Sequence, residues 1–195
     1  MANKILAFLV GILTARYLGP DHYGVINYAA AYTTFFASIC SLGINSILVK
    51  EFVEHPEQEG EIIGTTVVLQ TLSGILSAGM IVGIVSLIDR REPLTILVVA
   101  LYSLGAVFQV AGTLSYWFQA KLRSKYPAIA SLLAYLLTSA YKIFLLASGK
   151  SILWFAVANS VEYLVVSVFL YAVYRKQNGP PLHFSRQKAG ELPRS

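Results

Sequence analysis

PAIASLLAYLLTSAYKIFLLAS, residues 127–148, is the stretch that decides the fold class of this chain. It contains 22 residues and a single charged side chain, Lys142. As an α-helix it would be about 33 Å long at ~1.5 Å per residue, which is enough to cross a hydrocarbon layer about 30 Å thick. The stretch therefore predicts a transmembrane helix, and the lysine within it needs an explanation of its own.

The composition extends this prediction to most of the chain. Hydrophobic residues make up 56% and charged residues 13%, whereas a soluble domain has about 25% charged residues. Apolar runs of about 20 residues recur between short polar loops. We expect an all-α, polytopic transmembrane bundle of about six spans, with residues 1–176 as one helical lobe and residues 177–195 as a polar tail or linker. The expected spans are 4–18, 23–49, 62–88, 93–118, 127–148 and 152–174.

The distribution of basic residues predicts the orientation of the bundle. The net charge is +5, but the basic residues gather at the ends of the spans, so we exclude nucleic-acid binding. The side that holds both termini carries Lys4, Lys50, Lys121, Arg123, Lys125, Arg175, Lys176, Arg186, Lys188 and Arg194. The opposite side carries Arg16, Arg90, Arg91 and Lys150. Because basic loops stay inside, both termini are expected in the cytoplasm.

Polar side chains recur at helical spacing within the spans. Residues three and four apart share one face of a helix, and steps of this kind connect the polar residues of five spans. They are Thr34, Ser38, Ser41 and Asn45; Thr66, Gln70, Ser73 and Ser77; Gln109, Thr113 and Tyr116; Ser131, Tyr135, Thr138 and Lys142; and Asn159 with Glu162.

Two interpretations of these polar lanes stay open. Hydroxyl groups can join packed transmembrane helices, at about 0.6 kcal/mol for each hydrogen bond. Alternatively, the lanes line a water-filled cavity for a polar substrate. The candidate cavity residues are Arg16, Asn45, Gln70, Gln109, Tyr135 and Lys142.

Charges inside a membrane favour the cavity, because they are costly there and usually functional. Lys142 continues the lane of Tyr135 and Thr138 and suits an anionic group such as a phosphate, although it could also extend outward to the interface. Glu162 is either its structural ion-pair partner or a site that takes up a proton or sodium ion. Arg16 lies near the end of the first span, where a cation suits the helix dipole.

Two motifs resemble those of a known family. ARYLGPDHYG followed by LGINSILVKE, within residues 15–51, and SYWFQAKLRSKYPAIAS, residues 115–131, are similar to the corresponding stretches of Wzx-type oligosaccharide flippases. The matching positions are Arg16, Gly19, Pro20, Tyr23, Gly24, Gly43, Asn45, Lys50, Glu51, Trp117 and Gln119.

The resemblance implies a multi-pass protein of the bacterial inner membrane, in the multidrug and polysaccharide exporter superfamily. Such a protein moves undecaprenyl-diphosphate-linked oligosaccharide between leaflets by alternating access, with ion coupling and a second helical lobe. The family has twelve to fourteen spans, so this chain is expected to be its N-terminal half. A polysaccharide polymerase is a further expected partner.

The alternatives are a multidrug or cation exporter of the same superfamily and a half-subunit that does not transport alone. We expect no enzymatic activity, because no set of nucleophile, base and orienting group and no phosphate-binding glycine loop is present in the sequence. No cofactor is expected. The histidines His22, His55 and His183 lack metal-ligand spacing, so no metal is expected either.

Overall fold

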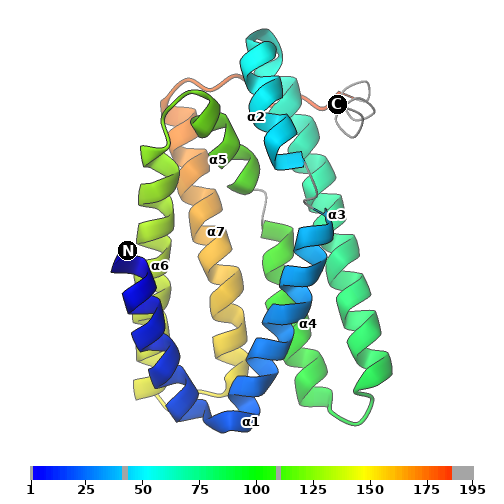
Figure 1. The fold of residues 1–195 in the computed structure, drawn as a ribbon, viewed down its shortest axis with the longest axis vertical. Helices are drawn as coiled ribbons and strands as arrows, with labels where there is room; N and C mark the ends of the chain where they lie inside the picture. The colour runs from blue at the N-terminus through cyan, green and yellow to red at the C-terminus, as the bar shows by residue number, and fades with distance from the viewer. Residues whose placement is uncertain (1, 41–43, 109–110, 186–195) are drawn as a thin grey trace.

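The computed structural model describes residues 2–40, 44–108 and 111–185. These parts are helical apart from turns and an extended tail, which confirms the predicted all-α bundle (Figure 1). The elements in chain order are α1 (Ala2–Cys40), α2 (Ile44–Glu54), η1 (Pro56–Gln58), α3 (Glu59–Ile88), α4 (Pro93–Val107), α5 (Ala111–Ala120), α6 (Lys125–Ala147) and α7 (Ile152–Lys176).

The chain reverses direction inside α1. Gly19 has φ 74° and ψ 170°, a combination that is essentially restricted to glycine. Pro20 follows it and can begin the second limb, because the first residues of a helix need no backbone N–H partner. Figure 1 shows the two limbs meeting at one end of the molecule. The expected separation of the spans 4–18 and 23–49 is therefore confirmed.

Two ends of the bundle can be distinguished by the segments that lie there. The hairpin end holds Gly19 and the turns that join α3 to α4 and α6 to α7 (Figure 1). The tail end holds α2, the turn between α5 and α6, and residues 177–185. At the hairpin end Tyr28 donates a hydrogen bond to Asp89 at 3.0 Å and Tyr17 donates one to the Lys150 carbonyl at 3.3 Å. These bonds fasten both limbs of α1 to neighbouring turns.

The fourth expected span is divided into two helices. We expected one helix over 93–118, but α4 ends at Val107 and α5 begins at Ala111. The Phe108 carbonyl, which lies at the end of α4, accepts a hydrogen bond of 2.9 Å from the Ser167 hydroxyl of α7. This bond satisfies a carbonyl at the helix end that would otherwise be unpaired inside a membrane. Residues 109 and 110 lie outside the described residues, so an uninterrupted helix over 93–118 stays a prediction there, and Pro93–Ala120 together is long and apolar enough to cross a membrane.

Among the described residues, four helical segments are long and apolar enough to cross a membrane, and the chain is a membrane protein. They are Pro56–Ile88, Pro93–Ala120, Lys125–Ala147 and Ile152–Lys176.

Two clusters of buried apolar side chains hold the helices together, one toward each end. The tail-end cluster contains Leu48, Phe52, Ile62, Ile63, Leu114, Trp117, Phe118, Ala130, Leu170 and Tyr174. The hairpin-end cluster contains Leu18, Ala29, Ile81, Val85, Val98, Val99, Leu145, Ile152, Phe155 and Ala156. The middle turns of α3, α4, α6 and α7 lie between the two clusters, and most of the predicted polar lanes fall in these turns.

Candidate functional site

The middle of the bundle carries a polar layer between the two apolar clusters. We define this layer as Gln70 and Thr113 from α3 and α5, Tyr102 from α4, Tyr135, Thr138 and Lys142 from α6, and Asn159, Ser160, Glu162 and Ser167 from α7. Its members come from five helices, so any chemistry there depends on the assembled bundle.

Part of the polar layer joins neighbouring helices. Asn159 Nδ2 donates to the Tyr102 carbonyl at 3.4 Å, and Ser160 Oγ donates to the Leu101 carbonyl at 3.0 Å. These bonds connect α7 to α4. Thr113 donates to the Gln70 side-chain oxygen at 2.8 Å and connects α5 to α3. For these residues the packing interpretation accounts for the polar group.

Other hydroxyl groups are satisfied within their own helix. Thr138 donates to the Ala134 carbonyl one turn earlier. Thr33 donates to the Ala29 carbonyl at 2.9 Å in the same way, and Thr71 donates to the Val67 carbonyl at 2.7 Å. Such bonds let a hydroxyl group lie inside a membrane without a partner on another helix.

The two charges of the polar layer lie within electrostatic reach of each other. The Glu162 carboxylate of α7 interacts electrostatically with the Lys142 ammonium of α6 and with the Tyr102 ring of α4. Both charged side chains are half-buried. Within the described parts of the chain, the two do not approach closely enough to form a direct ion pair. The arrangement is a separated pair of opposite charges, open to a third charged group.

The remaining predicted site residues are more scattered. Tyr135 is half-buried on α6, two turns before Lys142. Arg16 is exposed near the hairpin end, three residues before Gly19, and therefore lies away from the polar layer. The side chain of Asn45 and the whole of Gln109 lie outside the described residues, so their candidate roles remain predictions.

A second polar cluster, which we did not predict, lies at the tail end. The Glu59 carboxylate at the start of α3 is buried. It accepts a hydrogen bond of 2.8 Å from the Trp117 indole and pairs with the Lys121 ammonium at 2.5 Å. Trp117 and Lys121 are one turn apart on the same helix face, which is the signal that could have indicated a shared partner. The pair fastens the second sequence motif to α3.

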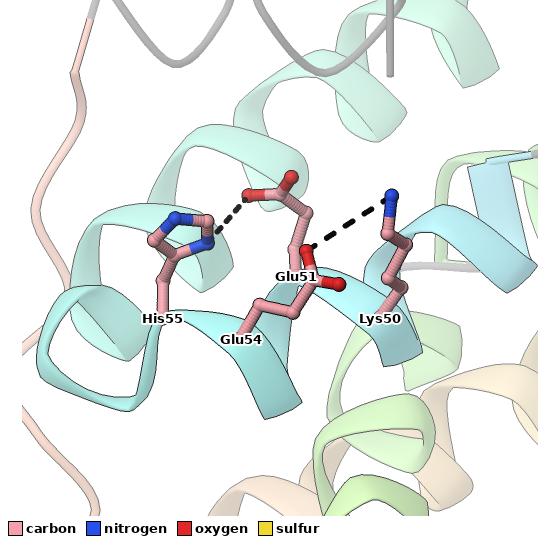
Figure 2. Close-up of polar contacts among 4 residues, drawn as sticks. All are labelled: Lys50, Glu51, Glu54 and His55. Carbon is pink, nitrogen blue, oxygen red and sulfur yellow. Dashed lines mark ion pairs between the residues drawn. The ribbon is translucent and has the colours of Figure 1, made fainter.

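The end of the first sequence motif lies in α2 and carries two further ion pairs (Figure 2). Lys50 lies 4.0 Å from Glu54, and both side chains are exposed. The His55 Nδ1 atom lies 3.5 Å from Glu51, whose side chain is mostly buried. Helix α2 also packs against α5. The two motif regions therefore meet at the tail end of the bundle.

Residues 177–185 continue past α7 and lie along the start of α3 (Figure 1). The His183 amide donates to the Gly60 carbonyl at 3.1 Å, and the Ser185 amide donates to the Thr65 hydroxyl at 3.0 Å. A Cβ atom on Gly64 would lie 2.4 Å from the His183 carbonyl oxygen. Glycine is therefore required for this close approach.

No group of three or more potential metal-ligating side chains occurs among the residues that the structure describes. Lys142 and Glu162 are the charged members of the polar layer, and their roles as an anion-attracting cation and an ion-coupling site stay predictions.

Comparison with known proteins identifies the family. No curated protein and no solved structure matches the chain significantly. A family model described as "Polysaccharide biosynthesis protein" matches residues 1–191. The match covers nearly the whole sequence and agrees with the resemblance seen in the two motifs. The chain belongs to the polysaccharide biosynthesis protein family.

Proposed function

We propose that this chain is the first lobe of a flippase that moves lipid-linked oligosaccharide across the cytoplasmic membrane for the synthesis of a surface polysaccharide. Two observations support the proposal: the chain belongs to a polysaccharide biosynthesis family with membrane-length helices, and Lys142 and Glu162 lie on two of these helices within electrostatic reach of each other. The protein is then a transporter rather than an enzyme, and its tail end faces the cytoplasm of the cell.

The separated charges suggest how an anionic head group and a coupling ion exchange. A diphosphate near Lys142 competes with Glu162 for the same ammonium group. When Glu162 takes up a proton or a sodium ion, its attraction for Lys142 falls and the ammonium becomes available to the phosphate. The two binding events are therefore coupled, and each changes the affinity for the other by the same factor.

The polar layer of one lobe forms one wall of a transport path. A second helical lobe supplies the opposite wall, and lipid-linked oligosaccharide passes between them with its sugars in water and its lipid chain in the bilayer. The head group that fits is an undecaprenyl diphosphate carrying an oligosaccharide, and a polysaccharide polymerase receives it on the far side.

The test is a set of substitutions placed in the gene at its native locus, so that every partner of the chain is present. Lys142→Ala is expected to lower surface polysaccharide about tenfold, equivalent to about 1.4 kcal/mol of lost phosphate attraction. Lys142→Arg keeps the charge and is expected to retain most of the polymer. Lys150→Ala removes an exposed lysine from the turn between α6 and α7 and serves as the matched control.

Two measurements make the result decisive. Immunoblots of the membrane fraction establish equal amounts of each variant, and lipid-linked oligosaccharide is measured on the cytoplasmic face. Accumulation there with Lys142→Ala, and not with Lys150→Ala, supports the proposal. Normal surface polysaccharide from a well-expressed Lys142→Ala variant overturns it. If that variant instead loses resistance to toxic organic cations, the protein is a drug exporter.

A further inference from the structure

An apolar pocket of about 350 Å³ lies toward the tail end of the bundle and shares Ser167 with the edge of the polar layer. Its lining comes from α3, α5, α7 and the tail, namely Ile63, Val67, Leu114, Ser167, Val168, Tyr171 and Leu182. The Ser167 hydroxyl is already bonded to two carbonyl groups, those of Phe108 and Tyr163. The wall therefore offers almost no free polar group to a ligand.

The pocket is separate from the proposed transport path. Nine residues separate Glu162 from Tyr171 on α7, or about two and a half helical turns. Glu162 and Tyr171 thus lie on opposite faces of the same helix. A ligand in the pocket would contact the face of α7 that does not carry the Glu162 charge.

The pocket lies at the depth where acyl chains meet head groups. Ser167 and Tyr171 precede the end of α7 by nine and five residues, which corresponds to about 8–14 Å along the helix. Val168 and Tyr171 are exposed and continue an apolar stripe that includes Leu164. This part of α7 therefore faces the hydrocarbon of the membrane. Because Val168 and Tyr171 also line the pocket, the pocket opens toward the acyl chains.

A cation lies one helical turn beyond the part of α7 that lines the pocket. Arg175 follows Tyr171 by four residues, so it lies one turn nearer the tail end on the same helix face. Its side chain is exposed and forms no ion pair within the described parts of the chain. An arginine with no acidic partner directly above an apolar pocket suits a phosphate attached to an alkyl chain.

We propose that this pocket binds an acyl chain of an anionic phospholipid from the adjacent leaflet, with the phosphate held by Arg175. A second helical lobe fits less well, because a helix is about 10 Å across and Leu182 of the tail closes the pocket at one end. The proposal needs the chain to lie in a membrane and does not depend on its transport function.

Native mass spectrometry of the purified, delipidated chain tests this proposal. The probes are dioleoyl phosphatidylglycerol and dioleoyl phosphatidylcholine, which share acyl chains and differ in net charge. The wild-type chain is expected to bind one phosphatidylglycerol about tenfold more tightly than phosphatidylcholine. Arg175→Gln is expected to remove this preference while leaving phosphatidylcholine binding unchanged.

Two pairs of variants distinguish the pocket from the general lipid surface. Val67→Trp fills the pocket and is expected to weaken phosphatidylglycerol binding about tenfold or more. Val68→Trp places the same bulk on the next, exposed residue of α3 and serves as its control. Leu182→Asp places a charge in the tail wall, with Phe184→Asp, an exposed tail residue outside the pocket, as control. Because Leu182 follows the last helix, this second pair remains informative if Val67→Trp does not fold.

Selective loss of binding with Leu182→Asp or a folded Val67→Trp supports the proposal. Equal lipid binding by Leu182→Asp and Phe184→Asp overturns it. It is also overturned if the chain dimerises, retains no lipid, and loses its dimer with Val67→Trp but not with Val68→Trp. In that case the pocket belongs to a protein interface.

Discussion

Replacing Lys121 with alanine should destabilise the tail end of the bundle much more than replacing any exposed lysine. Lys121 pairs with Glu59, whose side chain is 6% exposed, while that of Lys121 is 40% exposed. Removing one partner of a buried ion pair costs about 3–5 kcal/mol, because the other charge stays buried and unpaired. Since Lys121 is partly exposed and Trp117 still donates to Glu59, we expect about 3 kcal/mol, the low end of that range.

Lys50→Ala is the matched control for this prediction. Lys50 and Glu54 form an ion pair at 4.0 Å on α2, with side chains 59% and 51% exposed. An exposed pair one turn apart contributes only about 0.3–0.5 kcal/mol. Each variant removes the lysine partner of one glutamate near the same end of the bundle. The difference between their free energies of unfolding therefore reports the effect of burying the glutamate, not of having an ion pair.

The assay is equilibrium unfolding in mixed micelles of a mild detergent and dodecyl sulfate. The chain has two tryptophans, so a Trp154→Phe background leaves Trp117 as a fluorescent reporter within the Glu59 cluster. Adding Glu59→Gln to Lys121→Ala should restore about 2 kcal/mol, because a neutral amide is far less costly to bury than an unpaired carboxylate. If Lys121→Ala and Lys50→Ala lower the free energy of unfolding equally, the reasoning is refuted.

Two further predictions concern the tail and the orientation. Gly64→Leu should release residues 180–185 from α3 and speed hydrogen exchange of the His183 and Ser185 amides about fivefold, since each lost bond contributes about 1 kcal/mol. Gly79→Leu, where an added Cβ meets nothing within 4 Å, should leave the exchange rates unchanged, and equal rates in both variants would contradict the contact. In a Cys40→Ser background, a membrane-impermeant maleimide should label Ser151→Cys in intact cells and should label Lys176→Cys only after lysis. The reverse pattern would invert the proposed orientation.

Local signals in the sequence were sufficient for most helix boundaries. Gly19 and Pro20 mark the reversal in α1 because the one permits a positive φ and the other cannot continue a hydrogen-bonded helix. The end of α4 could not be predicted in this way, because residues 93–118 contain no proline after the first position. The Phe108 carbonyl is satisfied by Ser167, which is 59 residues away. A helix end stabilised by a residue that is distant in the sequence leaves no local pattern.

The contacts of the tail were hidden for a related reason. Residues 177–185 are polar and contain two consecutive prolines, a composition that favours a linker. Their position depends on the narrow surface that Gly60 and Gly64 provide on α3, more than 110 residues earlier in the chain. Two glycines four residues apart predict that some backbone approaches closely, but they do not identify which segment it is.

The polar lanes illustrate how far periodicity can support a functional site. Gln70 and Asn159 belong to polar lanes of the same kind as those of Lys142 and Glu162, yet both take part in hydrogen bonds to a neighbouring helix in the assembled bundle. Spacing cannot separate these two groups, because a packing contact and a cavity wall both require one polar face. The charges differ in that burial of an ion requires a counter-charge, and Lys142 and Glu162 lie within electrostatic reach of each other without a direct ion pair in the described structure. A charge held apart from its partner inside a membrane is stabilised further by an entering ion of the opposite sign. For this reason the Lys142 variants, rather than the amide or hydroxyl variants, are the decisive test of transport.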